Sequence, residues 1–165
     1  TNIKCVIIII NKTTQKKTTM ATTTATLTLA SSDLLTDNLS LSSTMLLNKG
    51  GTTATGLDQM NYHRAVVPTG TNFDLIEESD ALKDNSNYVY IINKNTDVTD
   101  YVTISINNEI IGKLYAGDWA FFPWSCDLSA ASNDSTIEVQ AYTHEAIIEY
   151  ALFHVGETLV TATDS

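Results

Sequence analysis

The sequence predicts an all-β protein: an antiparallel β-sandwich of jelly-roll-like form that carries an extended N-terminal arm. Short segments with alternating apolar and polar positions are separated by turn residues at close intervals, which is typical of sandwiches and barrels. Only 17% of the residues are charged, so Thr, Ser and Asn supply most of the polar surface, and these types favour strands and turns over helices. No long stretch has a helical period, which argues against a parallel sheet with crossover helices.

Four regions are expected along the 165 residues. Residues 1–19 are interpreted as a non-native or disordered leader that precedes a true start at Met20; they carry four lysines and no acid. The alternative is a short strand, Val6–Ile10, added to a sheet edge. Residues 20–48 are expected to form the arm, residues 57–155 the β-sandwich domain and residues 156–165 a flexible tail. A glycine-rich loop over residues 49–56 would join the arm to the body.

Within the arm, residues 21–29 alternate small or apolar side chains with Thr, which predicts a strand. Residues 31–37 can form one helical turn capped by Ser32 or Asp33. Alternation returns over residues 39–42.

The body contains one strong hairpin signal. Asn107 and Asn108 tolerate the positive φ angles of a two-residue turn between two branched segments. Counting outward from this turn places Ile104 opposite Ile111 and Tyr101 opposite Leu114. In the last segment Ile148, Tyr150 and Leu152 share one face and Glu149 lies on the other. The expected strands are 64–67 (ended or placed at an edge by Pro68), 72–77, 88–93, 101–106, 109–115, 118–124, 136–142 and 146–153.

Charge and apolar runs exclude several classes of partner. The net charge of −10 repels phosphate, so a nucleic-acid partner is not expected. The apolar run Cys5–Ile10 is far shorter than the ~20 residues that cross a bilayer, so a membrane partner is not expected either. Cys5 and Cys126 form no CxxC motif and are interpreted as unpaired thiols.

The sequence predicts no enzyme, metal site or cofactor. His63, His144 and His154 have neither the His-x-His nor the i, i+4 spacing of metal ligands. The chain has no G-x-S-x-G motif and no phosphate-binding glycine loop. Gly117–Pro123 looks like the opening of the second cupin motif, but the histidines that would follow it are missing. A cupin-like enzyme therefore ranks third among the functional hypotheses.

The segment Ala116–Trp124 holds four large aromatic side chains. In a regular strand Trp119, Phe121 and Pro123 share one face, and Ala120, Phe122 and Trp124 share the other. Such a strand has no purely solvent-exposed side. Three interpretations stay open: a core seam, a contact between subunits, or a platform for a ligand such as a carbohydrate. The candidate site residues are Trp119, Phe121, Phe122 and Trp124.

The strings Tyr88–Asn95, Ile111–Trp124 and Ile148–Phe153 resemble, in this order, runs in small virion structural proteins of tailed bacteriophages. Thr28–Leu41 is also similar to the start of those proteins. The resemblance implies a non-enzymatic subunit located in the virion, for capsid decoration or for attachment to head or tail. It implies a homo-oligomer that docks on other virion proteins. The alternative function is a carbohydrate-binding or receptor-binding β-sandwich module with a glycan ligand.

Overall fold

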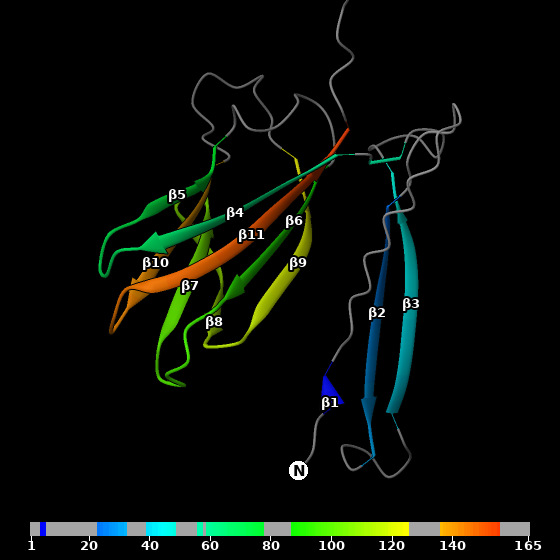
Figure 1. Cartoon of the computed structure of the whole chain (residues 1–165), viewed down its shortest axis with the longest axis horizontal. Helices are drawn as coiled ribbons and strands as arrows, with labels where there is room; N and C mark the ends of the chain where they lie inside the picture. The colour runs from blue at the N-terminus through cyan, green and yellow to red at the C-terminus, as the bar shows by residue number, and fades with distance from the viewer. Residues whose placement is uncertain are drawn as a thin grey trace, which may run out of the picture. The chain divides into compact units, whose positions relative to one another are not determined.

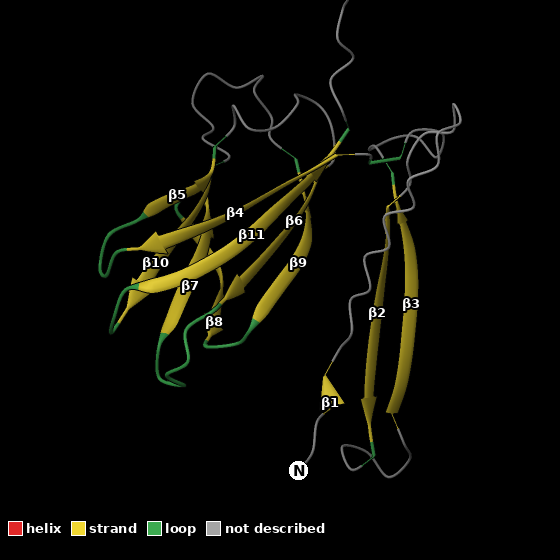
Figure 2. Ribbon diagram, viewed as in Figure 1, coloured by secondary structure: helices red, strands yellow, loops and turns green. Residues whose placement is uncertain are grey.

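In the computed structural model, all the regular secondary structure of the described residues is β-strand (Figures 1 and 2). The structure describes residues 4–5, 23–32, 39–48, 56–57, 59–77, 87–125 and 136–155, with only the backbone for residues 4–5. The prediction of an all-β antiparallel fold is confirmed. The chain divides into two compact units, Thr1–Asp58 and Gln59–Ser165. Within the described ranges no helix is long and apolar enough to cross a membrane.

The second unit contains two four-stranded sheets. Their strand orders are β5-β10-β7-β8 and β4-β11-β6-β9. The eight strands are β4 (Gln59–Val67), β5 (Phe73–Ile76), β6 (Asn87–Asn93), β7 (Tyr101–Ile106), β8 (Glu109–Tyr115), β9 (Trp119–Trp124), β10 (Ile137–Tyr142) and β11 (Ala146–His154).

The strand pairs of this unit are nested around one central hairpin. β7 pairs with β8, β6 with β9, β5 with β10 and β4 with β11, all antiparallel. The described strands of this unit therefore form one long hairpin of four antiparallel pairs. Successive pairs, counted outward from β7–β8, belong alternately to the two sheets. This is the connectivity of a jelly roll, as the sequence predicted.

The two sheets bury their facing sides in a common core. In β6, Val89 and Ile91 are fully buried, while Tyr88 and Tyr90 on the opposite side are half-buried. The same alternation puts Ile148 in the core from β11. The buried core consists of Val67, Leu75, Ile76, Val89, Ile91, Val102, Ile104, Leu114, Trp124, Ile137, Val139, Ala141, Ala146, Ile148 and Leu152.

The central hairpin has the predicted two-residue turn. Asn107 and Asn108 have φ angles of 54° and 62°, in the left-handed region that Asn tolerates better than most residues. The turn chemistry was therefore readable from the sequence.

The predicted register of this hairpin is wrong. Ile104 lies opposite Gly112 and not Ile111, and Tyr101 is likewise displaced by one residue from Leu114. The pairing shifts between Ile104 and Ser105, so β8 carries one extra residue close to the turn. Such a β-bulge cannot be counted from strand lengths alone.

The remaining strands of the body lie where alternation predicted them, with ends moved by about one residue. The exception is β4, which begins at Gln59, five residues before the predicted strand 64–67. It ends at Val67, directly before Pro68, and it is an edge strand as expected.

The first unit is a three-stranded antiparallel sheet of order β1-β2-β3. β1 (Lys4–Cys5) pairs with one edge of β2 (Thr23–Ser31), and β2 pairs along its whole length with β3 (Leu39–Leu47). The strands predicted at 21–29 and from residue 39 are therefore present, and β3 runs five residues beyond the alternation at 39–42. Leu57 N donates to Leu47 O at 2.9 Å and so connects residue 57 to the end of β3.

Several predictions concern residues outside the described ranges. These are the start at Met20, the strand Val6–Ile10, the helical turn over 33–37, most of the glycine loop at 49–56, Cys126 and the tail from residue 156.

Candidate interaction surface

The outward side of the sheet β4-β11-β6-β9 is covered by aromatic rings. β9 divides its large side chains as alternation predicted: Trp119 and Phe121 lie on the outward side, while Trp124 is 4% exposed in the core and Phe122 packs against it. The four candidate residues are thus shared between two surfaces. We define the aromatic face as Trp119 and Phe121 of β9, Tyr88 and Tyr90 of β6 and Tyr62 of β4. Phe153 of β11 lies on the same side of the sheet but is only 2% exposed, so it is not part of this accessible face.

The rings of the aromatic face contact one another in pairs. The centroids of Tyr88 and Phe121 are 5.5 Å apart with the planes 17° from parallel. Tyr90 and Trp119 are 6.3 Å apart, and Phe121 meets Phe153 edge-on at 6.2 Å. These separations lie in the range of favourable aromatic pairs. Each ring therefore packs against a neighbouring ring.

The edge strand β4 extends this face with exposed apolar groups. Met60, Tyr62 and Val66 are 51%, 53% and 55% exposed. They alternate along β4 and lie opposite the outward residues of β11. The aromatic face therefore continues to one edge of the sheet.

A cluster of three charged side chains lies beside these apolar residues. The carboxylate of Glu149 on β11 is 4.0 Å from Arg64 Nη1 and 3.9 Å from Lys94 Nζ. The hydroxyl of Tyr62 donates a hydrogen bond to Glu149, which is the main reason that the pKa of Tyr62 is raised. The pKa of Tyr90 is raised chiefly by burial and also by the charge of Glu149. At these exposures the ion pairs contribute little stability, and their polar groups stay accessible to a ligand.

The outward side of the other sheet carries a smaller aromatic cluster. The ring of Tyr101 stacks on Tyr142 at 4.9 Å and contacts Tyr115 at 5.4 Å. Lys113 Nζ lies 4.5 Å from the centroid of the Tyr101 ring, in cation–π range. Tyr115 is 45% exposed, so this cluster also presents an aromatic ring to solvent.

The three histidines lie in three different places. His63 stacks on Tyr150 at 5.4 Å, and His154 is buried at the end of β11. His144 Nδ1 is 2.9 Å from Asp100 Oδ1. Sequence spacing could not indicate this contact, because 44 residues separate the two. No group of three His, Cys, Asp or Glu side chains in the described part of the chain has the arrangement of a metal site.

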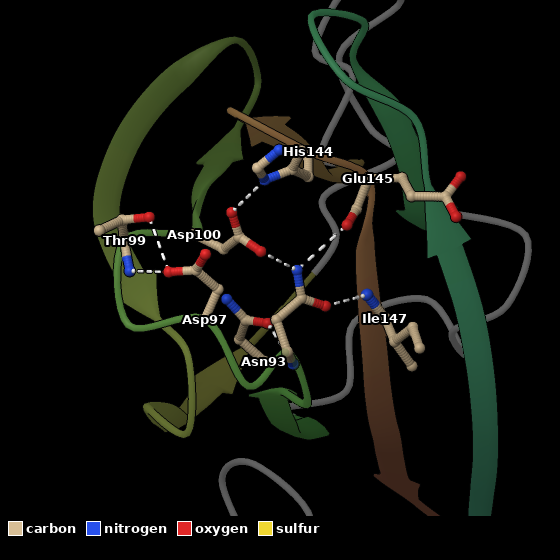
Figure 3. Close-up of polar contacts among 8 residues, drawn as sticks. Asn93, Asp97, Thr99, Asp100, His144, Glu145 and Ile147 are labelled. Atoms are coloured by element: carbon tan, nitrogen blue, oxygen red, sulfur yellow. Dashed lines mark hydrogen bonds and ion pairs between the residues drawn. The ribbon is translucent and has the colours of Figure 1, made fainter.

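The pair of His144 and Asp100 belongs to a hydrogen-bonded network at one end of the sandwich (Figure 3). Asn95 lies at its centre: Nδ2 donates to Asp100 Oδ2 at 3.0 Å and to the carbonyl of Glu145 at 3.1 Å. Its Oδ1 accepts from the backbone N of Ile147 at 2.9 Å. The side chain of Asn95 therefore fastens the loop after β6 to the turn between β10 and β11.

The charges in this network are matched by local donors. The hydrogen bond to Asp100, and then the charge of Asp100, raise the pKa of His144. Hydrogen bonds from the backbone N and the hydroxyl of Thr99, at 2.9 Å and 2.8 Å, lower the pKa of Asp97. Asp100 accepts from Asn95 and His144, so its carboxylate is satisfied although the residue is only 5% exposed. The network therefore has the geometry of a structural contact that connects the loop after β6 to the turn between β10 and β11.

No protein-family model matches the chain, and comparison with curated proteins and with solved structures gave no match either.

Proposed function

We propose that this chain is a non-enzymatic structural protein of a bacteriophage virion, as a capsid decoration or a head- or tail-associated subunit. It works by packing against copies of itself and against other particle proteins. The observation that carries the proposal is the aromatic face, a preformed apolar surface on the outside of a rigid sandwich.

The chemistry of this face suits a protein partner. Tyr, Trp and Phe are enriched at protein interfaces and at their energetic centres, because each buries a large area with few rotatable bonds. The ring pairs of Trp119 with Tyr90 and of Phe121 with Tyr88 are already packed, so docking orders few side chains. A partner that covers these rings gains apolar burial at a small entropic cost.

The fold and the motif resemblance support the proposed location in a virion. Jelly rolls build viral capsid domains, but also lectins and cupins, so the fold alone does not select among them. The strings at 88–95, 111–124 and 148–153 resemble virion proteins. The first two contain most of β6 and all of β9, two of the four strands of the sheet that carries the aromatic face.

Light scattering and sedimentation of the full chain test the self-association. We expect a concentration-dependent oligomer whose dissociation constant rises about thirty-fold or more when Trp119→Ala and Tyr90→Ala are combined, as at an interface hot spot. Tyr115→Ala is the matched control, because Tyr115 is an exposed aromatic residue on the other sheet. It should change the dissociation constant by less than about threefold. A full chain that stays monomeric at every concentration and binds no other particle protein contradicts the proposal.

A carbohydrate-binding module is the second candidate, because flat rings lie beside polar groups that can bind hydroxyls. Trp119 and Tyr90 supply the rings, and Glu149 with Arg64 supplies hydrogen-bonding groups on the same side of the sheet. A glycan array separates the two functions. A monomer that binds one class of sugar, and loses it with Trp119→Ala, favours this candidate.

A further inference from the structure

The strand β4 lies at one edge of the sheet that carries the aromatic face. In the described part of the chain it pairs with β11 alone, over its nine residues and without a register shift. Residues 59–64 and Val66 are exposed, so the outer side of this edge is accessible. A regular edge strand of this kind can pair with a further strand, because its outer backbone groups point away from the sheet.

The other edge strands of the two described sheets carry features that limit such pairing. β9 contains Pro123, which has no backbone N–H to donate, and β8 contains the β-bulge. β5 consists of only four residues. β4 contains no Pro or Gly, and its only permanently charged residue, Arg64, already faces Glu149 at 4.0 Å. Among the described edges, β4 is therefore the one best suited to pair with another strand.

The outward side of β4 is complementary to itself in the antiparallel sense. His63 is the midpoint of the strand. An antiparallel pair of two β4 strands centred on this residue sets Tyr62 of each copy opposite Arg64 of the other, where the guanidinium group can contact the ring in a cation–π pair. The same register sets Met60 opposite Val66, two exposed apolar side chains that cover each other.

The inward side of β4 accepts the same register. It sets His63 opposite His63 and Asn61 opposite Ala65, so neither pair contains a Lys, Arg, Asp or Glu side chain. Gln59 would lie opposite Val67, whose side chain is already buried in its own core, so we restrict the ladder to residues 60–66.

Neighbouring registers fit less well. A slip of one residue sets every outward side chain of one strand against an inward side chain of the other. An axis through Arg64 sets the two guanidinium groups opposite each other, which is unfavourable. An axis through Tyr62 sets Arg64 opposite Met60 and leaves Val66 beyond the end of the second β4 strand.

We propose that β4 pairs with β4 of a second copy of this chain, antiparallel and about a two-fold axis through His63. The sheet then continues from one copy to the other in the order β9-β6-β11-β4-β4-β11-β6-β9. The aromatic faces of the two copies lie on the same side and join at Tyr62. The interface is isologous, as in most symmetric dimers. The inference rests on the proposed self-association and gives it a defined surface, the edge of β4, which is separate from the rings of Trp119 and Tyr90.

Cross-linking of the full chain tests the edge. In a background with Cys5→Ser and Cys126→Ser, His63→Cys places one thiol of each copy opposite the other, with the Cβ atoms about 5 Å apart. Gln59→Cys, on the same side of the same strand and also exposed, places the two thiols about eight residues apart along the ladder, about 27 Å. A short bismaleimide should convert most of the His63→Cys protein to a covalent dimer and leave the Gln59→Cys protein uncross-linked. No dimer with His63→Cys, or equal yields at both positions, overturns the pairing.

A charge-pair comparison tests the register. Met60→Lys with Val66→Lys sets like charges opposite each other twice across the axis, whereas Met60→Lys with Val66→Glu sets opposite charges there. Both variants lose the same two exposed apolar side chains. The dissociation constant of the first should exceed that of the second on the order of tenfold at low salt, and the difference should shrink at high salt. General repulsion between copies would give the reverse order, because two added lysines bring the net charge of −10 closer to zero and Lys with Glu does not.

The two proposals fail in different ways. If the two charge variants associate equally and His63→Cys forms no dimer while the unmodified chain is oligomeric, the β4 pairing is wrong and self-association stands. If His63→Cys is cross-linked but the two charge variants associate equally, the register about His63 is wrong. If the unmodified chain is a monomer at every concentration, the self-association is wrong and the β4 pairing falls with it.

Discussion

Removal of the Asn95 side chain should destabilise the sandwich unit more than its position in a loop suggests. Asn95→Ala deletes two donated hydrogen bonds, to Asp100 and to the carbonyl of Glu145, and one accepted from Ile147 N. Each hydrogen bond contributes about 0.5–1.5 kcal/mol net, and one to a charged group contributes more. The expected loss is about 2–4 kcal/mol of the free energy of unfolding.

Asn95→Asp is a more specific test, because the Asp side chain has almost the same shape as Asn but lacks the N–H donors. The new carboxylate keeps the acceptor for Ile147 N, but it replaces the donor that lies 3.0 Å from Asp100 Oδ2 with a second acceptor. Two carboxylates at that distance repel and cannot both stay ionised at little cost. We expect a loss at least as large as for Asn95→Ala at neutral pH, and a partial recovery as acidification protonates one of them.

Urea unfolding followed by tryptophan fluorescence measures both effects, because Trp124 is buried in the core. With a slope of about 1–3 kcal/mol per molar urea, the midpoint should fall by about 1–2 M for Asn95→Ala. Thr96→Ala, at the exposed neighbouring position, should change the free energy of unfolding by less than about 0.5 kcal/mol. If Asn95→Ala changes the free energy of unfolding no more than Thr96→Ala does, the network does not stabilise the contact between the loop after β6 and the β10–β11 turn.

Three further predictions concern the same unit. The raised pKa of His144 means that the folded state holds its proton more tightly than the unfolded chain does, so this contribution is complete below the ordinary value of 6.5 and is lost as pH rises through the folded pKa. The difference in urea midpoint between the unmodified chain and His144→Gln should therefore be largest at mildly acidic pH and decline above it; a constant difference contradicts the pairing. Asn108→Val should cost about 1–2 kcal/mol and Asn108→Gly much less, because φ is positive there; equal unfolding free energies contradict the turn. Trp124→Ala should cost about 3–5 kcal/mol of stability, whereas Trp119→Ala should cost clearly less and act on association instead; the reverse order in urea unfolding contradicts the assignment of the two faces.

Local patterns in the sequence were enough to predict the strands and the faces of β9. Strict alternation separates Trp119 and Phe121 from Phe122 and Trp124, and this depends only on the two-residue period of a strand. The turn at Asn107 and Asn108 followed from backbone preference. In both cases the information lies within a few consecutive residues.

Features that depend on which distant strands meet could not be predicted. Whether a ring of β9 faces solvent or another ring depends on β6 being its neighbour, and no local pattern specifies that choice. The contacts of Glu149 with Arg64 and Lys94 arise because β11 lies between β4 and β6. The bulge in β8 adds one unpaired residue, which a count outward from the turn does not reveal.

The nested order of the strand pairs has a consequence for synthesis. β11 is synthesised after the other described strands of this unit, yet it lies between β4 and β6 and pairs with both. Until it emerges, Val67 of β4 and Val89 of β6 have no strand between them, and the apolar side of that sheet stays open to water. The sandwich must therefore close only after β11 has emerged, through the described strand pairing that is most distant in the chain, β4 with β11. Slow closure of this kind exposes nascent copies to aggregation and favours their capture by chaperones.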